Sequence, residues 1–118
     1  MKAIAGYNSH CNLLFIGGIM TFYLLHPKEM ERIRTEKNAI VIDVRERTAY
    51  QQYHYKNAVN IPYCDTESWL SHFCCGRSYI LYCDYGNISL LAARKLAKNG
   101  IAAYTVIGGL KELERYSR

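Results

Sequence analysis

The sequence predicts an α/β fold of three layers, in which helices flank a central parallel sheet of about five strands. Short apolar runs alternate with amphipathic segments along the chain, which is the pattern of repeated strand–helix units. The run at residues 39–44 is apolar except for one carboxylate, as expected of a parallel strand covered on both faces. The chain has 118 residues, half of them hydrophobic, which is enough for the core of one such domain.

Five segments have the length and composition of strands. They are residues 21–25, 39–44, 58–61, 79–83 and 103–107. Pro62 closes the third strand, because proline cannot donate a hydrogen bond to a neighbouring strand. Gly108 and Gly109 follow the fifth strand and permit a tight turn into the last helix.

Five helices are expected between and after these strands. They cover residues 28–37, 46–53, 66–73, 88–98 and 110–116. The first follows Pro27, whose missing N–H costs nothing at the start of a helix. Thr66 is a suitable N-cap for the third. The fourth is the clearest, with basic residues near its end and Asn99 and Gly100 as a stop signal.

We expect one domain, at residues 20–118, preceded by an N-terminal appendage at residues 1–19 whose role the sequence leaves open. Residues 13–25 are apolar apart from Thr21, but they fall short of the roughly 20 residues of a membrane span. No clear signal-peptide cleavage site follows, so a signal anchor is disfavoured, whereas Met20 as a second translation start stays open. A cytoplasmic location is expected.

Charge and cysteine content narrow the function classes. The net charge of +5 comes from scattered Lys and Arg pairs, which favours solvated helix faces over a nucleic-acid groove. Five cysteines without a CxxC pair or an evident secretory signal are typical of free cytoplasmic thiols. Cys64, His72, Cys74 and Cys75 match no standard metal-site spacing, so neither a metal nor another cofactor is expected.

The segment at residues 78–100 gives the clearest indication of a reactive residue. It reads as a strand, a tight loop and a helix, with Cys83 where the loop begins and Gly86 where it turns back. The first N–H groups of the helix and its positive dipole end would stabilise a thiolate there. We therefore interpret Cys83 as a nucleophile rather than a buried core cysteine.

The residue at the end of this loop indicates whether the loop holds a phosphate or a charged sulfur. A phosphatase loop needs an arginine at the position of Ser89 to hold phosphate with two hydrogen bonds. Ser89 cannot do this, which disfavours a phosphatase or an arsenate reductase. We expect its hydroxyl to support the loop and Cys83 to carry a charged sulfur.

Four segments, taken in order, resemble the rhodanese-like sulfurtransferases over residues 21–115. They are IVIDVRE at 40–46, YHYKNAVNIP at 53–62, CDYGNIS at 83–89 and VIGGL at 106–110. The resemblance implies a small single-domain sulfurtransferase of the thiosulfate sulfurtransferase type. The Cys83 thiolate would take sulfur from thiosulfate or a persulfide, and the Cys83 persulfide would then pass it to a thiol or cyanide.

The same resemblance suggests roles for other residues. Backbone N–H groups of the loop would stabilise the anionic sulfur and bind substrate. These groups belong to Asp84, Tyr85, Gly86, Asn87, Ile88 and Ser89. From the residues themselves, we expect Asp43, Arg45 and His54 to be structural supports rather than catalytic groups. The implied partners are a small sulfur donor and a thiol acceptor, such as a thioredoxin-like protein, with a protein persulfide as another donor.

The sequence also departs from the family pattern. Many members with thiosulfate activity carry a basic residue at the position of Asp84, whose carboxylate would repel a dianion and disfavour a thiolate. Thiosulfate is therefore expected to be a poor donor compared with other sulfane sulfur. The alternative function is a rhodanese-fold binding or regulatory module, which the intact Cys83 disfavours. Cys64 is more readily an inert thiol than a resolving one, and Cys74 and Cys75 pack rather than form a vicinal disulfide.

Overall fold

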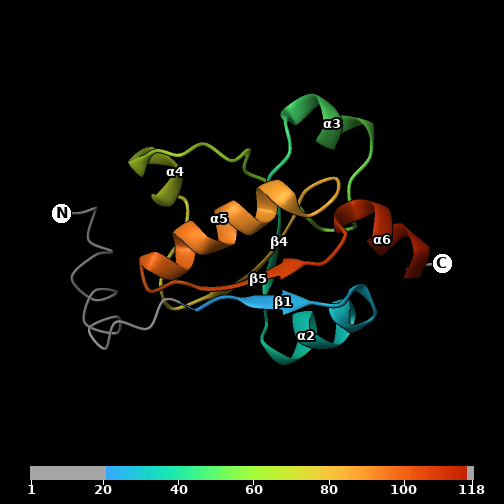
Figure 1. The fold of residues 1–118 in the computed structure, drawn as a ribbon, viewed down its shortest axis with the longest axis horizontal. Coiled ribbons are helices and arrows are strands. Elements are labelled where there is room, and N and C mark those ends of the chain that lie inside the picture. Colours follow the sequence, from blue (N-terminus) through green and yellow to red (C-terminus); the bar gives the residue numbers. More distant parts are fainter. Residues whose placement is uncertain (1–20, 117–118) are drawn as a thin grey trace.

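Residues 21–116 are described by a computed structural model, and they form a parallel five-stranded sheet with helices on both faces (Figure 1). The order of the strands is β1-β5-β4-β2-β3, and every pairing is parallel. Their bounds are β1 Tyr23–Leu25, β2 Ile40–Asp43, β3 Val59–Asn60, β4 Ser78–Tyr82 and β5 Ala102–Val106. The predicted fold class is confirmed, and each strand overlaps the segment expected for it.

The helices also fall in the expected segments. Their bounds are η1 Pro27–Glu29, α2 Met30–Glu36, α3 Arg47–Gln52, α4 Glu67–Leu70, α5 Asn87–Lys98 and α6 Gly109–Tyr116. The first expected helix is divided into a 3-10 turn and an α-helix. Helix α4 is shorter than expected, because the N–H groups of His72 and Phe73 bond to carbonyls three residues back rather than continuing the α-helix.

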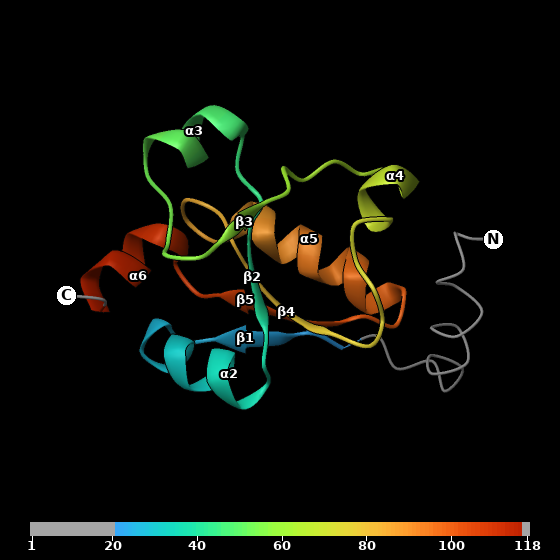
Figure 2. The ribbon, with the colours of Figure 1, turned by 180° about the vertical axis from the view of Figure 1, so that it is seen from behind.

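Each face of the sheet has its own core. Side chains from α4 and α5, such as Trp69 and Leu96, pack with Leu81 on one face. Side chains from α2 and α6, such as Met30, pack with Ile80 on the other (Figures 1 and 2). Successive residues of β4 thus enter opposite cores, so β2 and β4 are apolar on both faces.

The carboxyl edge of the sheet brings together the loops that follow β2, β4 and β5. The Val44 N–H, just after β2, donates to the carbonyl of Tyr82 at 3.0 Å. The Leu110 N–H, in the first turn of α6, donates to the carbonyl of Cys83 at 2.8 Å. Cys83 follows the central strand β4, so both neighbouring loops can reach it, as is usual for sites in open parallel sheets.

The predicted appendage at residues 1–19 lies outside the described residues. Between residues 21 and 116, no helix is long and apolar enough to cross a membrane.

Candidate functional site

The loop between β4 and α5 encircles the sulfur of Cys83. The N–H groups of Gly86 and Ser89 donate to Sγ at 3.1 Å and 3.3 Å. Gly86 has a φ of 105°, in the left-handed region, and a Cβ there would lie 3.2 Å from the Gly108 nitrogen. The side chain of Cys83 is buried, so these two donors meet the sulfur away from bulk water.

A pair of buried hydroxyls lies behind the sulfur. Ser89 is fully buried, with its Oγ 3.6 Å from the Cys83 Sγ. The hydroxyl of Thr105, on β5, donates to this Oγ at 2.8 Å. Sequence reasoning singled out Ser89 but missed Thr105, although a lone hydroxyl in a buried strand is a usable signal.

The first turn of α6 holds the beginning of the loop. Besides the Leu110 bond to Cys83, the Lys111 N–H donates to the carbonyl of Asp84 at 3.3 Å. Gly109 has a φ of 66°, and a Cβ there would lie 2.5 Å from the carbonyl oxygens of both Cys83 and Asp84. The close approach therefore requires glycine, which gives a physical reason for the Gly-Gly-Leu sequence.

Arg45 joins the ends of β2 and β4. Its Nε and Nη2 bond to the two carboxylate oxygens of Asp43 at 3.1 Å and 2.8 Å, and its Nη1 bonds to Asp84 at 3.1 Å. Burial alone would lower the pKa of Arg45, but the hydrogen bonds and negative charge of Asp43, with help from Asp84, raise it above its ordinary value. The guanidinium is therefore a permanent, well-compensated charge.

Asp43 is itself fully buried and has a second partner. The Tyr82 hydroxyl donates to its Oδ2 at 2.8 Å and accepts the Tyr55 N–H at 2.9 Å. Burial first, and then the hydrogen bond to Asp43, raise the pKa of Tyr82 well above its ordinary value. Neither tyrosine was singled out by the sequence, since only the fold brings them to the carboxylate.

His54 lies away from the sulfur. Its ring stacks on that of Tyr50, with centroids 3.8 Å apart, and its Nδ1 is 2.9 Å from the Tyr50 carbonyl. It does not line the cavity at Cys83.

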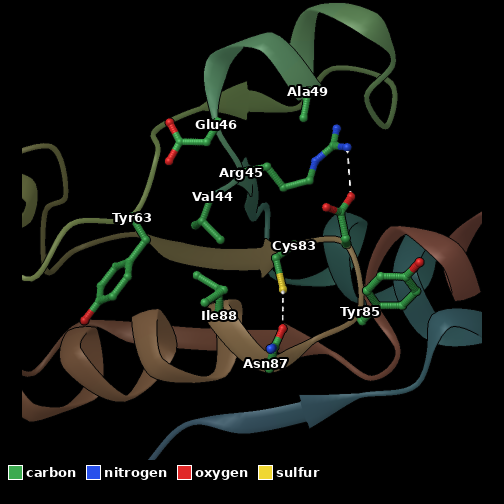
Figure 3. Close-up of a pocket in the computed structure, with 10 residues that line it drawn as sticks. Val44, Arg45, Glu46, Ala49, Tyr63, Cys83, Tyr85, Asn87 and Ile88 are labelled. Carbon is green, nitrogen blue, oxygen red and sulfur yellow. Dashed lines mark hydrogen bonds and ion pairs between the residues drawn. The ribbon is translucent and has the colours of Figure 1, made fainter.

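A cavity of about 380 Å³ opens in front of Cys83 (Figure 3). Figure 3 shows Val44 and Ile88 on the same side of the sulfur, one above the other, and Asn87 beneath it. The Asn87 Oδ1 is 3.8 Å from Sγ, as an acceptor for the thiol. The lining is mainly apolar and comprises Val44, Arg45, Glu46, Ala49, Tyr63, Cys83, Asp84, Tyr85, Asn87 and Ile88.

The other cysteines lie elsewhere. Cys64 is exposed and lines a separate hollow beside Trp69 and His72. Cys74 is a free, exposed thiol, whereas Cys75 is disulfide-bonded, so the two form no vicinal disulfide and the expectation of free thiols is wrong for Cys75. Within residues 21–116, no group of His, Cys, Asp and Glu side chains has the arrangement of a metal site.

Comparison with known proteins identifies the family. The Rhodanese-like domain matches residues 26–115, and the chain belongs to that family. The crystal structure of reduced CoADR-RHD from Bacillus anthracis superposes with a TM-score of 0.71 at 27% identity, covering 80% of this chain and 17% of that one.

Two named relatives bear on activity. A tRNA sulfurtransferase of Thermoplasma acidophilum is 37% identical over 68 residues, which are 58% of this chain and 14% of that protein's length. The thiosulfate sulfurtransferase GlpE of Pseudomonas savastanoi is 26% identical over 93 residues, which are 78% of this chain and 88% of GlpE. These relatives support an enzyme of the sulfurtransferase type.

Proposed function

We propose that this chain transfers sulfane sulfur through a persulfide on Cys83. The observation that carries this proposal is the sulfur of Cys83 with two backbone N–H groups directed at it, beside an open cavity. Donors fixed before reaction stabilise a thiolate and a persulfide without reorganisation. The other described free thiols, Cys64 and Cys74, accept no backbone N–H bond of this kind.

In the first half-reaction, the thiolate of Cys83 attacks the outer sulfur of a donor. A new S–S bond forms on Cys83, the donor's own S–S bond breaks, and its remaining part leaves with the electron pair. The N–H groups of Gly86 and Ser89 stabilise the negative charge on the sulfur of Cys83 before this step, and the negative charge of the product persulfide lies on its outer sulfur.

In the second half-reaction, the outer sulfur of the persulfide passes to an acceptor thiolate or cyanide. The thiolate of Cys83 is then the leaving group, so the donors that stabilise it assist this step as well. A small thiol, or the thiol of a thioredoxin-like protein, is a suitable acceptor.

The buried hydroxyl pair assists the thiolate. Thr105 donates to the Ser89 oxygen, and the Ser89 hydroxyl donates to the Gly86 carbonyl at 3.4 Å; when Cys83 is ionised, this proton can turn from the carbonyl toward the sulfur. Ser89 thereby adds a third donor to the two backbone N–H groups.

The test is mass spectrometry of the intact protein after incubation with thiosulfate, cysteine persulfide or another sulfane donor. We expect a gain of one sulfur on Cys83, absent from Cys83→Ser and retained by the matched controls Cys64→Ser and Cys74→Ser. Sulfur transfer to cyanide should fall at least about a thousandfold in Cys83→Ser.

Two results would overturn the proposal. If no donor adds sulfur to Cys83 in folded protein, the binding or regulatory alternative is favoured. Aryl phosphate hydrolysis that disappears in Cys83→Ser, without persulfide formation, would instead indicate a phosphatase.

A further inference from the structure

Among the residues that the structure describes, Arg45 is the only positive charge lining the Cys83 cavity, and most of its N–H donors already bond to other groups of the protein. A guanidinium has five N–H donors. Four of those on Arg45 are used: Nε and one Nη2 donor by Asp43, the second Nη2 donor by the Tyr53 carbonyl, and one Nη1 donor by Asp84. Arg45 therefore cannot offer the two parallel donors that hold an oxyanion.

Negative charge outnumbers positive charge around the same cavity. Within residues 21–116, its lining includes the carboxylates of Glu46 and Asp84 but only one cation, the guanidinium of Arg45. Asp84 is more than half exposed, so it faces any anion that enters. A doubly charged donor such as thiosulfate meets repulsion here and no free pair of donors.

The rest of the cavity suits an apolar body. Five of its lining residues, Val44, Ala49, Tyr63, Tyr85 and Ile88, present aliphatic or aromatic surface. Its volume of about 380 Å³ lies within the range of pockets that bind small organic molecules. An inorganic ion would leave most of this surface uncovered (Figure 3).

We propose that Cys83 takes its sulfur from small organic sulfane compounds with an apolar body, such as alkyl or aryl thiosulfonates and persulfides, in preference to inorganic thiosulfate. This inference rests on the proposed function and names its substrate class. The apolar body occupies the space between Val44, Tyr63 and Ile88, and the outer sulfur points at Cys83.

For each class of donor, one S–S bond forms on Cys83 and one S–S bond of the donor breaks. From a thiosulfonate, the thiolate of Cys83 takes the outer sulfur and a sulfinate leaves with the electron pair of the broken S–S bond. From an organic persulfide, the corresponding thiolate leaves. Neither reaction needs an oxidant or a reductant.

The test measures second-order rates of sulfur loading of Cys83 from benzenethiosulfonate, methanethiosulfonate and thiosulfate. Each rate is divided by the rate of the same donor with free cysteine at the same pH, which removes intrinsic reactivity. The two thiosulfonates carry the same single charge, so their ratio reports the apolar body. We expect benzenethiosulfonate to exceed methanethiosulfonate at least about tenfold, and thiosulfate to be the slowest.

Two pairs of variants separate the apolar contribution from the charge. Ile88→Ala should lower the benzenethiosulfonate rate about three- to tenfold and leave methanethiosulfonate nearly unchanged. Its control is Leu91→Ala, on the same helix, exposed to a similar degree and outside the cavity. Asp84→Asn should raise the thiosulfate rate up to about tenfold, by removing a charge and releasing Arg45, whereas the surface control Asp65→Asn should not.

The outcomes separate this inference from the proposed function. Cys83 loaded fastest by thiosulfate, or equally by both thiosulfonates, would overturn the substrate class and leave the sulfurtransferase intact. Failure of every donor to load Cys83 would overturn both.

Discussion

Two polar regions meet at the carboxyl edge of the sheet, and they stabilise charge by different means. In the loop at residues 83–89, backbone N–H groups converge on one sulfur and no oppositely charged side chain bonds to it. In the cluster formed by Asp43, Arg45 and Tyr82, the charged side chains bond to one another and are almost fully satisfied.

The difference separates a reacting charge from a structural one. A sulfur that gains and loses negative charge during the reaction is best stabilised by fixed dipoles, because these remain in place when the sulfur is neutral. A buried permanent charge needs an opposite charge beside it, which then makes it a poor ligand for substrate. The arginine nearest the cavity is thus a support of the fold rather than a substrate clamp.

The largest expected effect on stability comes from disrupting the cluster of Asp43, Arg45 and Tyr82. Asp43→Ala should lower the free energy of unfolding by about 3–5 kcal/mol, because it leaves the mostly buried Arg45 without its main partner. Asp84→Ala removes the other carboxylate bonded to the same arginine, but Asp84 is mostly exposed, so its loss should cost about 1 kcal/mol or less. Urea denaturation of both variants tests this directly, and equal losses would contradict the division between the two carboxylates.

A smaller effect is expected where α6 packs on the sulfur loop. Gly109→Ala places a methyl group 2.5 Å from two carbonyl oxygens of the sulfur loop, at a φ of 66°. It should cost about 2–3 kcal/mol and slow alkylation of Cys83, since the loop must move.

Gly76→Ala is the matched control, because a Cβ at Gly76 meets nothing within 4 Å. Its stability and its alkylation rate should remain those of the wild type. If Gly109→Ala behaved like Gly76→Ala in both measurements, the close packing of α6 on the loop would be unimportant.

The two regions also differ in how far the sequence predicts them. The sulfur loop is local: Cys83, Gly86 and the helix start are near neighbours in the chain, so their spacing predicts their arrangement. The structural cluster depends on β2 pairing with β4, which sets Asp43 opposite Tyr82. The bond from Arg45 to Asp84 likewise joins residues 39 apart in the sequence. Neither follows from local patterns, and for the same reason Thr105 was missed behind Ser89.

The smallest expected effect is a dependence of stability on alkaline pH through Tyr82. Burial and the bond to Asp43 raise its pKa in the folded protein, whereas an unfolded tyrosine titrates near pH 10. The contribution of the Tyr82 hydroxyl to stability is therefore fully present below about pH 10 and declines above it, as only the unfolded chain loses the proton.

At pH 7, Tyr82→Phe should be about 1–2 kcal/mol less stable, since it loses the bonds to Asp43 and Tyr55. Urea denaturation of wild type and variant from pH 7 to 11 should show this gap narrowing only above about pH 10. A gap that stays constant to pH 11 would mean that Tyr82 ionises as readily in the folded protein as in the unfolded chain.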